Sequence, residues 1–266
     1  MSQAQKFNLD GKVAIVTGGS RGVGKGVAEE LADAGATVYV TGRSVEKAAL
    51  GFGCIPVTCD HTQESQVFDA IARVVTEQQR IDILVNNVWG GYEQMVENGA
   101  FTWTRPFWQQ PIWRWDAMFS AGVRAHYVAS SVVARQMVEQ RSGLIVNISF
   151  WSARKHIGNV AYGVSKAATD KLTADCAQEL REFGVAVISL YPGMVRTEKV
   201  MEAAAYLDLS NSESPRFIGR AVAALATDPT VMQRSGHVVI AAACAKDYGF
   251  EDIDGRRPEP IMLDKA

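Results

Sequence analysis

The chain has 266 residues, with 27 basic and 29 acidic side chains and a formal charge of −2. Its hydrophobic fraction of 47% and charged fraction of 21% are those of an ordinary globular protein, and they exclude an intrinsically disordered chain. The balanced charge gives no basic surface for nucleic acid or anionic membranes, while the length leaves one large domain or two small ones open.

Short apolar segments rich in β-branched residues alternate with helical patterns along the whole chain. The apolar segments predict strands at residues 12–17, 37–41, 55–58, 81–85, 144–148, 185–190 and 237–240. Helical spacing of apolar residues predicts helices at 22–34, 66–79, 113–139 and 161–183. This alternation is typical of a parallel sheet with helices on both faces. We therefore predict a single doubly wound α/β domain, 1–266, with about seven strands.

Three stretches interrupt the alternation. Residues 89–115 carry five of the six tryptophans, residues 193–216 are polar with helical character, and the extension from residue 241 is charged. Long insertions in compact domains are usually functional loops, so the first two are expected to flank a substrate site. Aromatic walls there favour an apolar or ring-bearing substrate. The alternative is that some of these tryptophans lie in the core or in a subunit interface.

Features of targeting and metal binding are missing from the sequence. No apolar run reaches the length of a membrane span, and residues 1–12 lack the apolar region of a signal peptide. The four cysteines are scattered without a CxxC pair, and the histidines show no spacing of metal ligands. We expect a reduced, cytoplasmic protein.

The first predicted strand ends in the glycine-rich turn Thr17-Gly18-Gly19-Ser20-Arg21-Gly22-Val23-Gly24, in which a helix begins. Glycines at such a turn let the backbone approach a pyrophosphate, and the helix N-terminus attracts its charge. The pattern is TGxxxGxG and not the dinucleotide fingerprint GxGxxG. Residues 18–22 also match GxSxG, the nucleophile elbow of serine hydrolases, but too little chain precedes them to supply the oxyanion donor.

The end of the second predicted strand indicates which cofactor is bound. NAD sites usually place Asp or Glu there, about 20 residues beyond the turn, whereas this chain has Gly42 followed by Arg43. A carboxylate would repel a 2′-phosphate, while the planar guanidinium of Arg binds one. With Arg21 as a second basic group, the pattern favours NADP(H) over NAD(H). The alternative is that both arginines are solvated surface residues.

Tyr162 and Lys166 are four residues apart at the start of a predicted helix, so they share one helix face. A nearby cation favours the phenolate and lowers the pKa of a tyrosine. Such a tyrosine can exchange a proton with an alcohol or carbonyl group near neutral pH. Further polar residues follow other predicted strands, at the carboxyl ends where open α/β sheets bind ligands: Asp60, Asn86, Asn87, Ser149 and Tyr191-Pro192-Gly193.

These motifs occur in an order that resembles the short-chain dehydrogenase/reductase family, from about residue 9 to residue 240. Residues 35–43, 172–180 and 247–256 resemble one animal branch of that family. The resemblance implies a Rossmann fold and NAD(P)(H)-dependent oxidoreduction. It implies that Tyr162 is the acid/base, that Lys166 lowers its pKa and binds the nicotinamide ribose, and that Ser149 orients the substrate oxygen.

The same resemblance implies a cofactor site. Gly18, Gly22 and Gly24 would line the pyrophosphate, Asp60 would contact the adenine and Asn87 the adenosine ribose. The nicotinamide would lie between residues that follow the sixth strand. The complete predicted set is Gly18, Ser20, Arg21, Gly22, Val23, Arg43, Asp60, Asn87, Tyr162, Lys166, Pro192, Val195 and Thr197.

Three positions depart from the family pattern. Trp89 follows Asn86-Asn87-Val88, so a tryptophan enters the rim of the cofactor site. Phe150 follows Ser149 where many members have a second Ser, although the 13-residue spacing to Tyr162 still selects Ser149 over Ser152. Gly122 occupies the place of a family Asn that holds a water for proton relay to the lysine, and its absence puts that relay in doubt.

Several functions remain open. The first is a carbonyl reductase that uses NADPH to reduce a ketone. The second is a nucleotide-binding module with little catalysis, which Gly122 suggests, and the third is an NAD-dependent alcohol dehydrogenase. A hydrolase comes last. The predicted helices 113–139 and 161–183 could pair across a two-fold axis, as in family oligomers, to give a homodimer or homotetramer.

Overall fold

A parallel sheet of seven strands occupies the centre of the molecule. The computed structural model describes residues 7–51 and 53–261. The strands of the sheet are β1 (Val13–Thr17), β2 (Thr37–Gly42), β3 (Cys54–Thr58), β4 (Ile83–Asn86), β7 (Gly143–Ile148), β8 (Val185–Tyr191) and β11 (Val238–Ile240). Their spatial order is β3-β2-β1-β4-β7-β8-β11. The order reverses between β1 and β4, and ligands bind at such a switch point in open α/β sheets.

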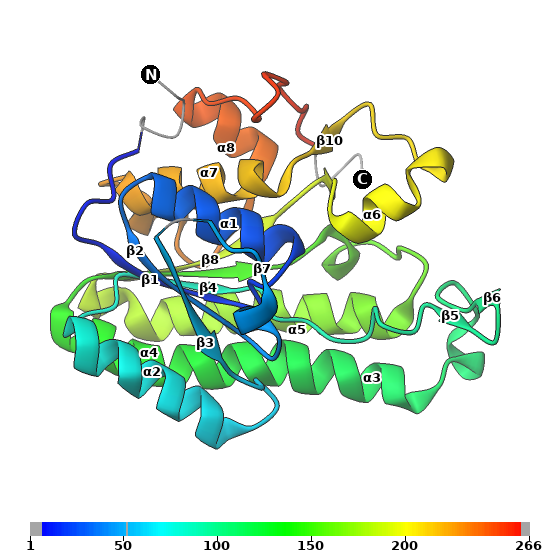
Figure 1. Cartoon of the computed structure of the whole chain (residues 1–266), viewed down its shortest axis with the longest axis horizontal. Coiled ribbons are helices and arrows are strands. Elements are labelled where there is room, and N and C mark those ends of the chain that lie inside the picture. The colour runs from blue at the N-terminus through cyan, green and yellow to red at the C-terminus, as the bar shows by residue number, and fades with distance from the viewer. Residues whose placement is uncertain (1–6, 52, 262–266) are drawn as a thin grey trace.

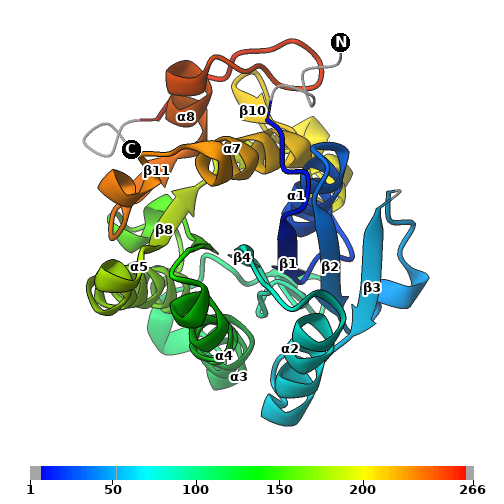
Figure 2. The ribbon, with the colours of Figure 1, turned by 90° about the vertical axis from the view of Figure 1, so that its left-hand side faces the viewer.

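Helices cover both faces of the sheet (Figure 1, Figure 2). One face carries α1 (Gly22–Asp33), α7 (Pro215–Thr227) and α8 (Ala241–Tyr248), and the other carries α2 (Glu64–Gln78), α4 (Ala125–Gln140) and α5 (Val160–Leu180). Each face has its own hydrophobic core, because successive side chains of a strand point to opposite sides. In β1, Ala14 and Val16 pack into the first core, while Val13 and Ile15 pack into the second. The doubly wound α/β fold is confirmed.

The two predicted insertions contain small elements. Residues 89–115 include a hairpin of β5 (Val96–Glu97) and β6 (Ala100–Phe101). Residues 193–216 include β9 (Met194–Val195), α6 (Glu198–Glu202) and β10 (Ser212–Glu213), which pairs in parallel with β9. The helical character predicted for this segment is therefore confined to α6 and a short 3-10 turn. Figure 1 shows the hairpin and α6 at the same end of the molecule, on the right.

The helix predicted at 113–139 is interrupted. It consists of α3 (Ile112–Met118), a π-helical turn at Phe119–Arg124, and α4. A π turn is wider than an α turn and is frequent at functional sites. The buried Gly122 lies within it.

Two helices, α7 and α8, are absent from the sequence prediction. α7 packs along α1, and the buried carboxylate of Glu30 joins them by accepting hydrogen bonds from Arg216 Nε (2.8 Å) and Arg220 Nε (3.0 Å). The first turn of α7 is capped by Ser214, with Pro215 at the first helical position. The tail after α8 returns to the loop that follows β9, where Asp252 accepts from Arg196 Nη2 (2.9 Å).

Candidate active site

The glycine-rich turn between β1 and α1 packs closely against the loop that follows β4. A Cβ on Gly18, whose φ is +67°, would lie 2.7 Å from Val88 Cα, and a Cβ on Gly24 would lie 2.3 Å from Asn87 Nδ2. The Asn87 amide donates to the carbonyl oxygens of Thr17 (3.0 Å) and Gly18 (2.9 Å). Glycine is therefore required at both positions. Asn87, predicted to contact the adenosine ribose, holds the shape of this turn.

The N-terminus of α1 already binds a carboxylate. The side chain of Arg21, which precedes the helix, does not cap it. Instead the backbone N–H of Gly22 donates to Glu198 Oε2 at 3.0 Å. Glu198 lies at the start of α6, so the insertion after β8 reaches across to the glycine-rich turn. No pattern in the sequence indicates this contact, because it joins residues 176 positions apart.

The predicted adenosine end of the site lies beyond β2 and β3. Arg21 and Arg43 are both exposed, and Ser20 lies beside the last residue of β2, its Oγ 3.9 Å from a Cβ placed on Gly42. Burial acts to raise the pKa of Asp60. Hydrogen bonds from Thr62 and the charge of Arg43 outweigh that effect and lower it. Arg43 and Asp60 thus lie close enough to interact electrostatically. Val23, by contrast, packs partly buried against the hydrophobic core.

The loop after β8 carries Pro192, Val195 and Thr197. Val195 is buried in the core, and Thr197 caps α6 while its Cγ2 lies 3.4 Å from a Cβ placed on Gly22. This loop therefore contacts the glycine-rich turn, as a shared cofactor site would require. Gly193 N donates to Glu213 Oε2 at 2.7 Å, and burial raises the pKa of Glu213 to about 7.

Tyr162 and Lys166 lie on the first turns of α5, on one helix face as predicted. Asn159 begins the helix by accepting a hydrogen bond from Tyr162 N at 3.0 Å. Lys166 Nζ lies 5.8 Å from the centre of the Tyr162 ring and donates to the Ile148 carbonyl oxygen at 3.0 Å. Both side chains are buried, with exposed fractions of 8% and 5%.

Burial dominates the titration of both groups. It raises the pKa of Tyr162 to about 12, an effect opposed by the neighbouring hydroxyls of Tyr92 and Ser152. Burial also lowers the pKa of Lys166 to about 7, opposed by the charge of Asp170. The expected lowering of the tyrosine pKa by the lysine does not appear in this arrangement, where burial raises the pKa and the Tyr92 and Ser152 hydroxyls oppose the rise.

The two candidate serines lie in different surroundings. Ser149 is buried, and its Oγ donates to the backbone carbonyl oxygen of Lys166 at 3.4 Å. Ser152 lies in the 3-10 turn Trp151–Ala153, and its hydroxyl is the one that lowers the pKa of Tyr162. The next residue after Ser149, Phe150, packs its ring 6.1 Å from that of Tyr162.

Aromatic rings enclose Tyr162. The ring centres of Trp89, Tyr92 and Trp103 lie 5.9, 5.9 and 5.5 Å from its own. Together with Phe150 they form an aromatic enclosure around the tyrosine. Two of the five tryptophans in the insertion thus reach the site, whereas Trp108 is 71% exposed and lies outside it. Tyr92 carried no sequence signal and is found only from the structure.

A buried arginine holds the insertion in place. Arg114 has no exposed surface, and its guanidinium donates to Thr102 Oγ1 (2.8 Å) and to the Gln94 carbonyl oxygen (2.9 Å). Its cationic carbon lies 5.8 Å from the centre of the Trp103 ring. Arg114 therefore positions Trp103, a function that no motif in the sequence indicates.

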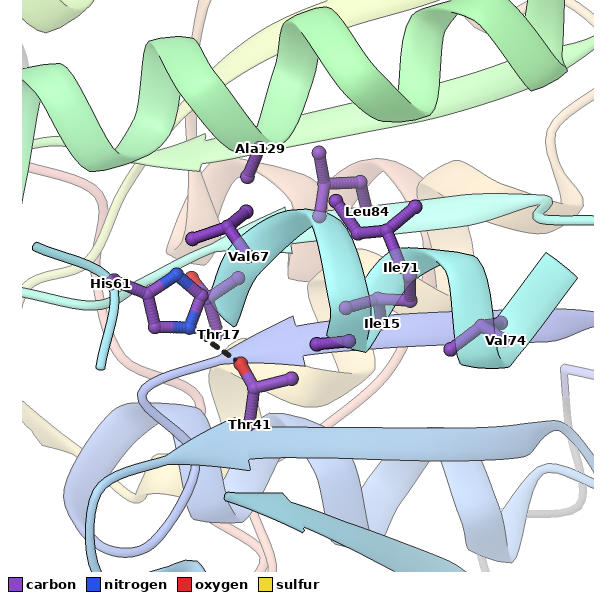
Figure 3. Close-up of a pocket in the computed structure, with 10 residues that line it drawn as sticks. Ile15, Thr17, Thr41, His61, Val67, Ile71, Val74, Leu84 and Ala129 are labelled. Atoms are coloured by element: carbon purple, nitrogen blue, oxygen red, sulfur yellow. Dashed lines mark hydrogen bonds between the residues drawn. The ribbon is translucent and has the colours of Figure 1, made fainter. Parts of the chain in front are cut away.

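A small cavity of about 10 Å³ lies between the sheet and α2 (Figure 3), and Tyr162 is not among the residues that line it. His61 lies at its edge, where Nε2 is 2.7 Å from Thr41 Oγ1. The remaining lining is mainly apolar, with Ile15, Val67 and Ile71 among its residues. Burial lowers the pKa of His61 to about 4, so the imidazole is neutral near pH 7. This space is the size of a single water and does not accommodate a substrate.

Within residues 7–51 and 53–261, no group of three or more His, Cys, Asp or Glu side chains could hold a metal ion. None of the helices in this part of the chain combines the length and hydropathy needed to cross a bilayer.

Comparison with known proteins identifies relatives over nearly the whole chain. The profile of the family described as short chain dehydrogenase matches residues 12–207. The mouse protein (Mus musculus) named Dehydrogenase/reductase SDR family member 1 is 43% identical over 270 residues, which cover 93% of this chain and 85% of that protein. Its human counterpart (Homo sapiens) is 42% identical over the same shares. These matches confirm the animal branch that the sequence resembles.

Solved structures agree with this relationship. A short-chain type dehydrogenase/reductase from Mycobacterium marinum is 28% identical, with a TM-score of 0.72 over 89% of this chain and 96% of that one. The named relatives are dehydrogenases and reductases, which makes this protein an oxidoreductase. The chain belongs to the short-chain dehydrogenase/reductase family.

Proposed function

We propose that the protein is an NADP(H)-dependent oxidoreductase that transfers a hydride between the nicotinamide and a secondary alcohol or ketone. An apolar or ring-bearing carbonyl compound is the proposed substrate. The observation that supports this most is the Tyr162–Lys166 pair inside an aromatic enclosure. Aromatic side chains bury apolar ligands well, while a few polar groups fix their orientation.

The glycine-rich turn fits a dinucleotide. It has no room for side chains at Gly18 and Gly24, and its helix end attracts an anion, since Gly22 N–H donates to Glu198. A bound pyrophosphate would take the place of this carboxylate. Arg21 and Arg43, both exposed, are proposed to hold the 2′-phosphate, beside Asp60 at the adenine. The bound nicotinamide supplies or accepts the hydride.

Other residues are proposed to complete the cofactor site. They are Ser20, Val23 and Asn87 around the turn, Lys166 at the nicotinamide ribose, and Pro192, Val195 and Thr197 at the nicotinamide.

Proton transfer is assigned to Tyr162. In carbonyl reduction its hydroxyl donates a proton to the substrate oxygen, and the Lys166 ammonium stabilises the phenolate that remains. A serine hydroxyl orients the substrate oxygen. Spacing selects Ser149 for this role, and the proximity of Ser152 to Tyr162 makes Ser152 the second candidate. Ser149→Ala and Ser152→Ala variants separate the two.

The proposal is tested by NADPH oxidation with a panel of ketones that differ in size and polarity. Turnover is expected with apolar or ring-bearing members, and Tyr162→Phe is expected to lower kcat by about 10²–10⁴-fold because it removes the acid/base hydroxyl. Binding of NADP(H) by calorimetry is expected to persist in that variant. Turnover retained in Tyr162→Phe would refute the assigned mechanism.

A nucleotide-binding module with little catalysis is the second candidate. It is favoured by the π-helical turn, where Gly122 offers no polar side chain and faces the Trp89 ring that covers Lys166. This candidate predicts NADP(H) binding without turnover of any carbonyl compound. The NAD-dependent alcohol dehydrogenase is the third, and it predicts tighter binding of NAD than of NADP in the same calorimetric measurement.

We further propose a homo-oligomer that works in the cytoplasm. An open hollow of about 450 Å³ is lined by Phe119, Val123, Ser120 and Arg124 of the π-helical turn, by Tyr127 of α4 and by Leu172 of α5. Tyr127 is 58% exposed, and burial of such aromatic surface would favour pairing of these helices in a second copy. The four free cysteines, Cys54, Cys59, Cys176 and Cys244, fit a reducing compartment.

A further inference from the structure

The Lys166 ammonium is a buried cation with few polar partners. It can donate three hydrogen bonds, and within residues 7–51 and 53–261 its one hydrogen-bond acceptor is the Ile148 carbonyl oxygen at 3.0 Å. A charge removed from water needs compensation from its surroundings. The titratable groups that face it are Tyr162 and Asp170 on its own helix and His126 on α4. Burial and the charge of Lys166 lower the pKa of His126 to about 3, so this imidazole adds no positive charge near pH 7.

An aromatic face supplies the missing compensation. Lys166 Nζ lies 3.6 Å from the centre of the Trp89 ring. Indole has the strongest attraction for cations among the aromatic side chains, and the attraction increases when the pair is removed from water. The same ring meets Tyr162 edge-on, at 5.9 Å and an interplanar angle of 86°. One side chain therefore contacts both members of the Tyr162–Lys166 pair.

Trp89 reaches this place because position 122 has no side chain. A Cβ on Gly122 would lie 2.6 Å from Cζ3 and 2.8 Å from Cε3 of the indole. Gly122 belongs to the π-helical turn, so the backbone itself forms the wall against which the ring packs. Behind the ring, His126 Nε2 contacts the Val88 carbonyl oxygen at 3.0 Å and fixes the loop that carries Trp89.

We propose that Trp89 is a positioning residue that keeps the Lys166 ammonium charged and directed at Tyr162, and that Gly122 provides the room this requires. The proposal deepens the proposed function, on which it rests for the role of the pair. The indole stabilises the cation without a hydrogen bond, and it fills the space between Lys166 and the π-helical turn at Gly122. Trp89 itself exchanges no proton and acts through the lysine.

Direct titration of Lys166 tests this without any turnover. The full-length protein is labelled with ε-¹³C-lysine, and the Lys166 signal is assigned by its loss in Lys166→Met. In the wild type we expect titration near pH 7, since burial lowers the pKa of Lys166 to about that value. Trp89→Leu keeps an apolar filling but removes the aromatic face. We expect its midpoint to fall by about one pH unit.

The conservative variant and a surface control define the cause. Trp89→Phe retains a weaker aromatic face, so its midpoint is expected between those of wild type and Trp89→Leu. Trp108→Leu removes a tryptophan that is 71% exposed, and no shift is expected there. An unchanged or raised midpoint in Trp89→Leu would overturn the proposal. If Trp89→Leu does not fold, Trp89→Phe is measured instead: a lowered Lys166 midpoint supports the proposal, and an unchanged or raised midpoint overturns it.

The role of Gly122 is tested by combining substitutions. Gly122→Ala displaces the indole and is expected to lower the Lys166 midpoint in the wild-type background. In the Trp89→Leu background the same change is expected to add little, because the ring is already gone. Equal shifts in both backgrounds would refute the steric part of the proposal. Since these titrations need no substrate, the positioning of Lys166 by Trp89 is judged separately from the ketone assay.

Discussion

The guanidinium of Arg43 is exposed at the end of β2, and its charge lowers the pKa of Asp60 beyond β3. Gly42, the last residue of β2, offers no acidic side chain that would compete for it. The planar guanidinium of an arginine can form two parallel hydrogen bonds to a phosphate, so Arg43 is available for such a contact.

Removal of this side chain is expected to separate the two cofactors. Arg43→Ala should weaken NADP⁺ binding by about 10–100-fold, because charge-assisted hydrogen bonds to phosphate are lost. NAD⁺ binding should change little. Calorimetry with both cofactors checks this, with Arg135→Ala on the exposed side of α4 as the matched loss of one surface charge. An equal loss for both cofactors would contradict a role in reading the 2′-phosphate.

At the scale of residues, local spacing predicts what lies on one helix and misses what tertiary contact creates. Tyr162 and Lys166 share a face because four residues complete about one turn. Glu198 at the N-terminus of α1, and Arg114 under Trp103, depend on how distant segments meet. No pattern along the chain carries that information, so neither residue could be predicted.

Among the helices, α1 and α7 are joined by a buried carboxylate, and Arg216 of α7 also pairs with Asp33 of α1. Glu30 is 2% exposed and accepts hydrogen bonds from Arg216 and Arg220 on α7. Removal of one partner from a buried ion pair leaves the other charge uncompensated, which is more damaging than loss of a surface pair.

Glu30→Gln is therefore expected to lower the free energy of unfolding by about 2–3 kcal/mol. This is less than the loss of a whole buried partner costs, because the amide oxygen of Gln can still accept a hydrogen bond. Urea denaturation monitored by circular dichroism measures the change. Glu29→Gln is the matched control, because Glu29 is more exposed and pairs with Lys25 only at 3.8 Å. Its effect should stay below about 0.5 kcal/mol. Similar losses in both variants would show that Glu30 is not a special link.

Elements were predictable wherever periodicity and length agreed. The strands β1, β2, β4, β7 and β8 follow from their apolar β-branched segments. α7 carried a usable signal, Ser214 followed by Pro215, which is typical of a helix start. The π-helical turn at Phe119–Arg124 carried no such signal. A single wider turn leaves a helical spacing of apolar residues on both sides of it, so the sequence predicts one continuous helix.

In the molecule as a whole, Glu213 links parts of the chain that are far apart in sequence. Its carboxylate is 2% exposed and accepts from Gly193 N in the loop after β8. Asp252 of the C-terminal extension and Arg196 act on it electrostatically. Burial raises its pKa from 4.5 to about 7, so the folded protein favours the protonated form.

This shift makes overall stability depend on pH. The contribution of Glu213 is fully present below pH 4.5 and is lost as pH rises from there through about 7, because over this range the unfolded chain releases the proton that the folded protein retains. Glu213→Gln resembles the protonated carboxyl group and is expected to be more stable than wild type by about 3 kcal/mol at pH 8. The two proteins should be alike at pH 4.5. Denaturation at both pH values measures this, with exposed Glu202→Gln as control.

The pairing of α1 with α7 also determines how the chain must be made. Glu30 and Arg220 are 190 positions apart. At a synthesis rate of about 5–20 residues per second, roughly 10–40 s separate the appearance of the two helices. During this interval Val27 and Leu31, which are fully buried in the finished protein, have no partner from α7. The nascent chain therefore spends tens of seconds with an uncovered apolar helix face, the period in which a ribosome-bound chaperone would protect it from aggregation.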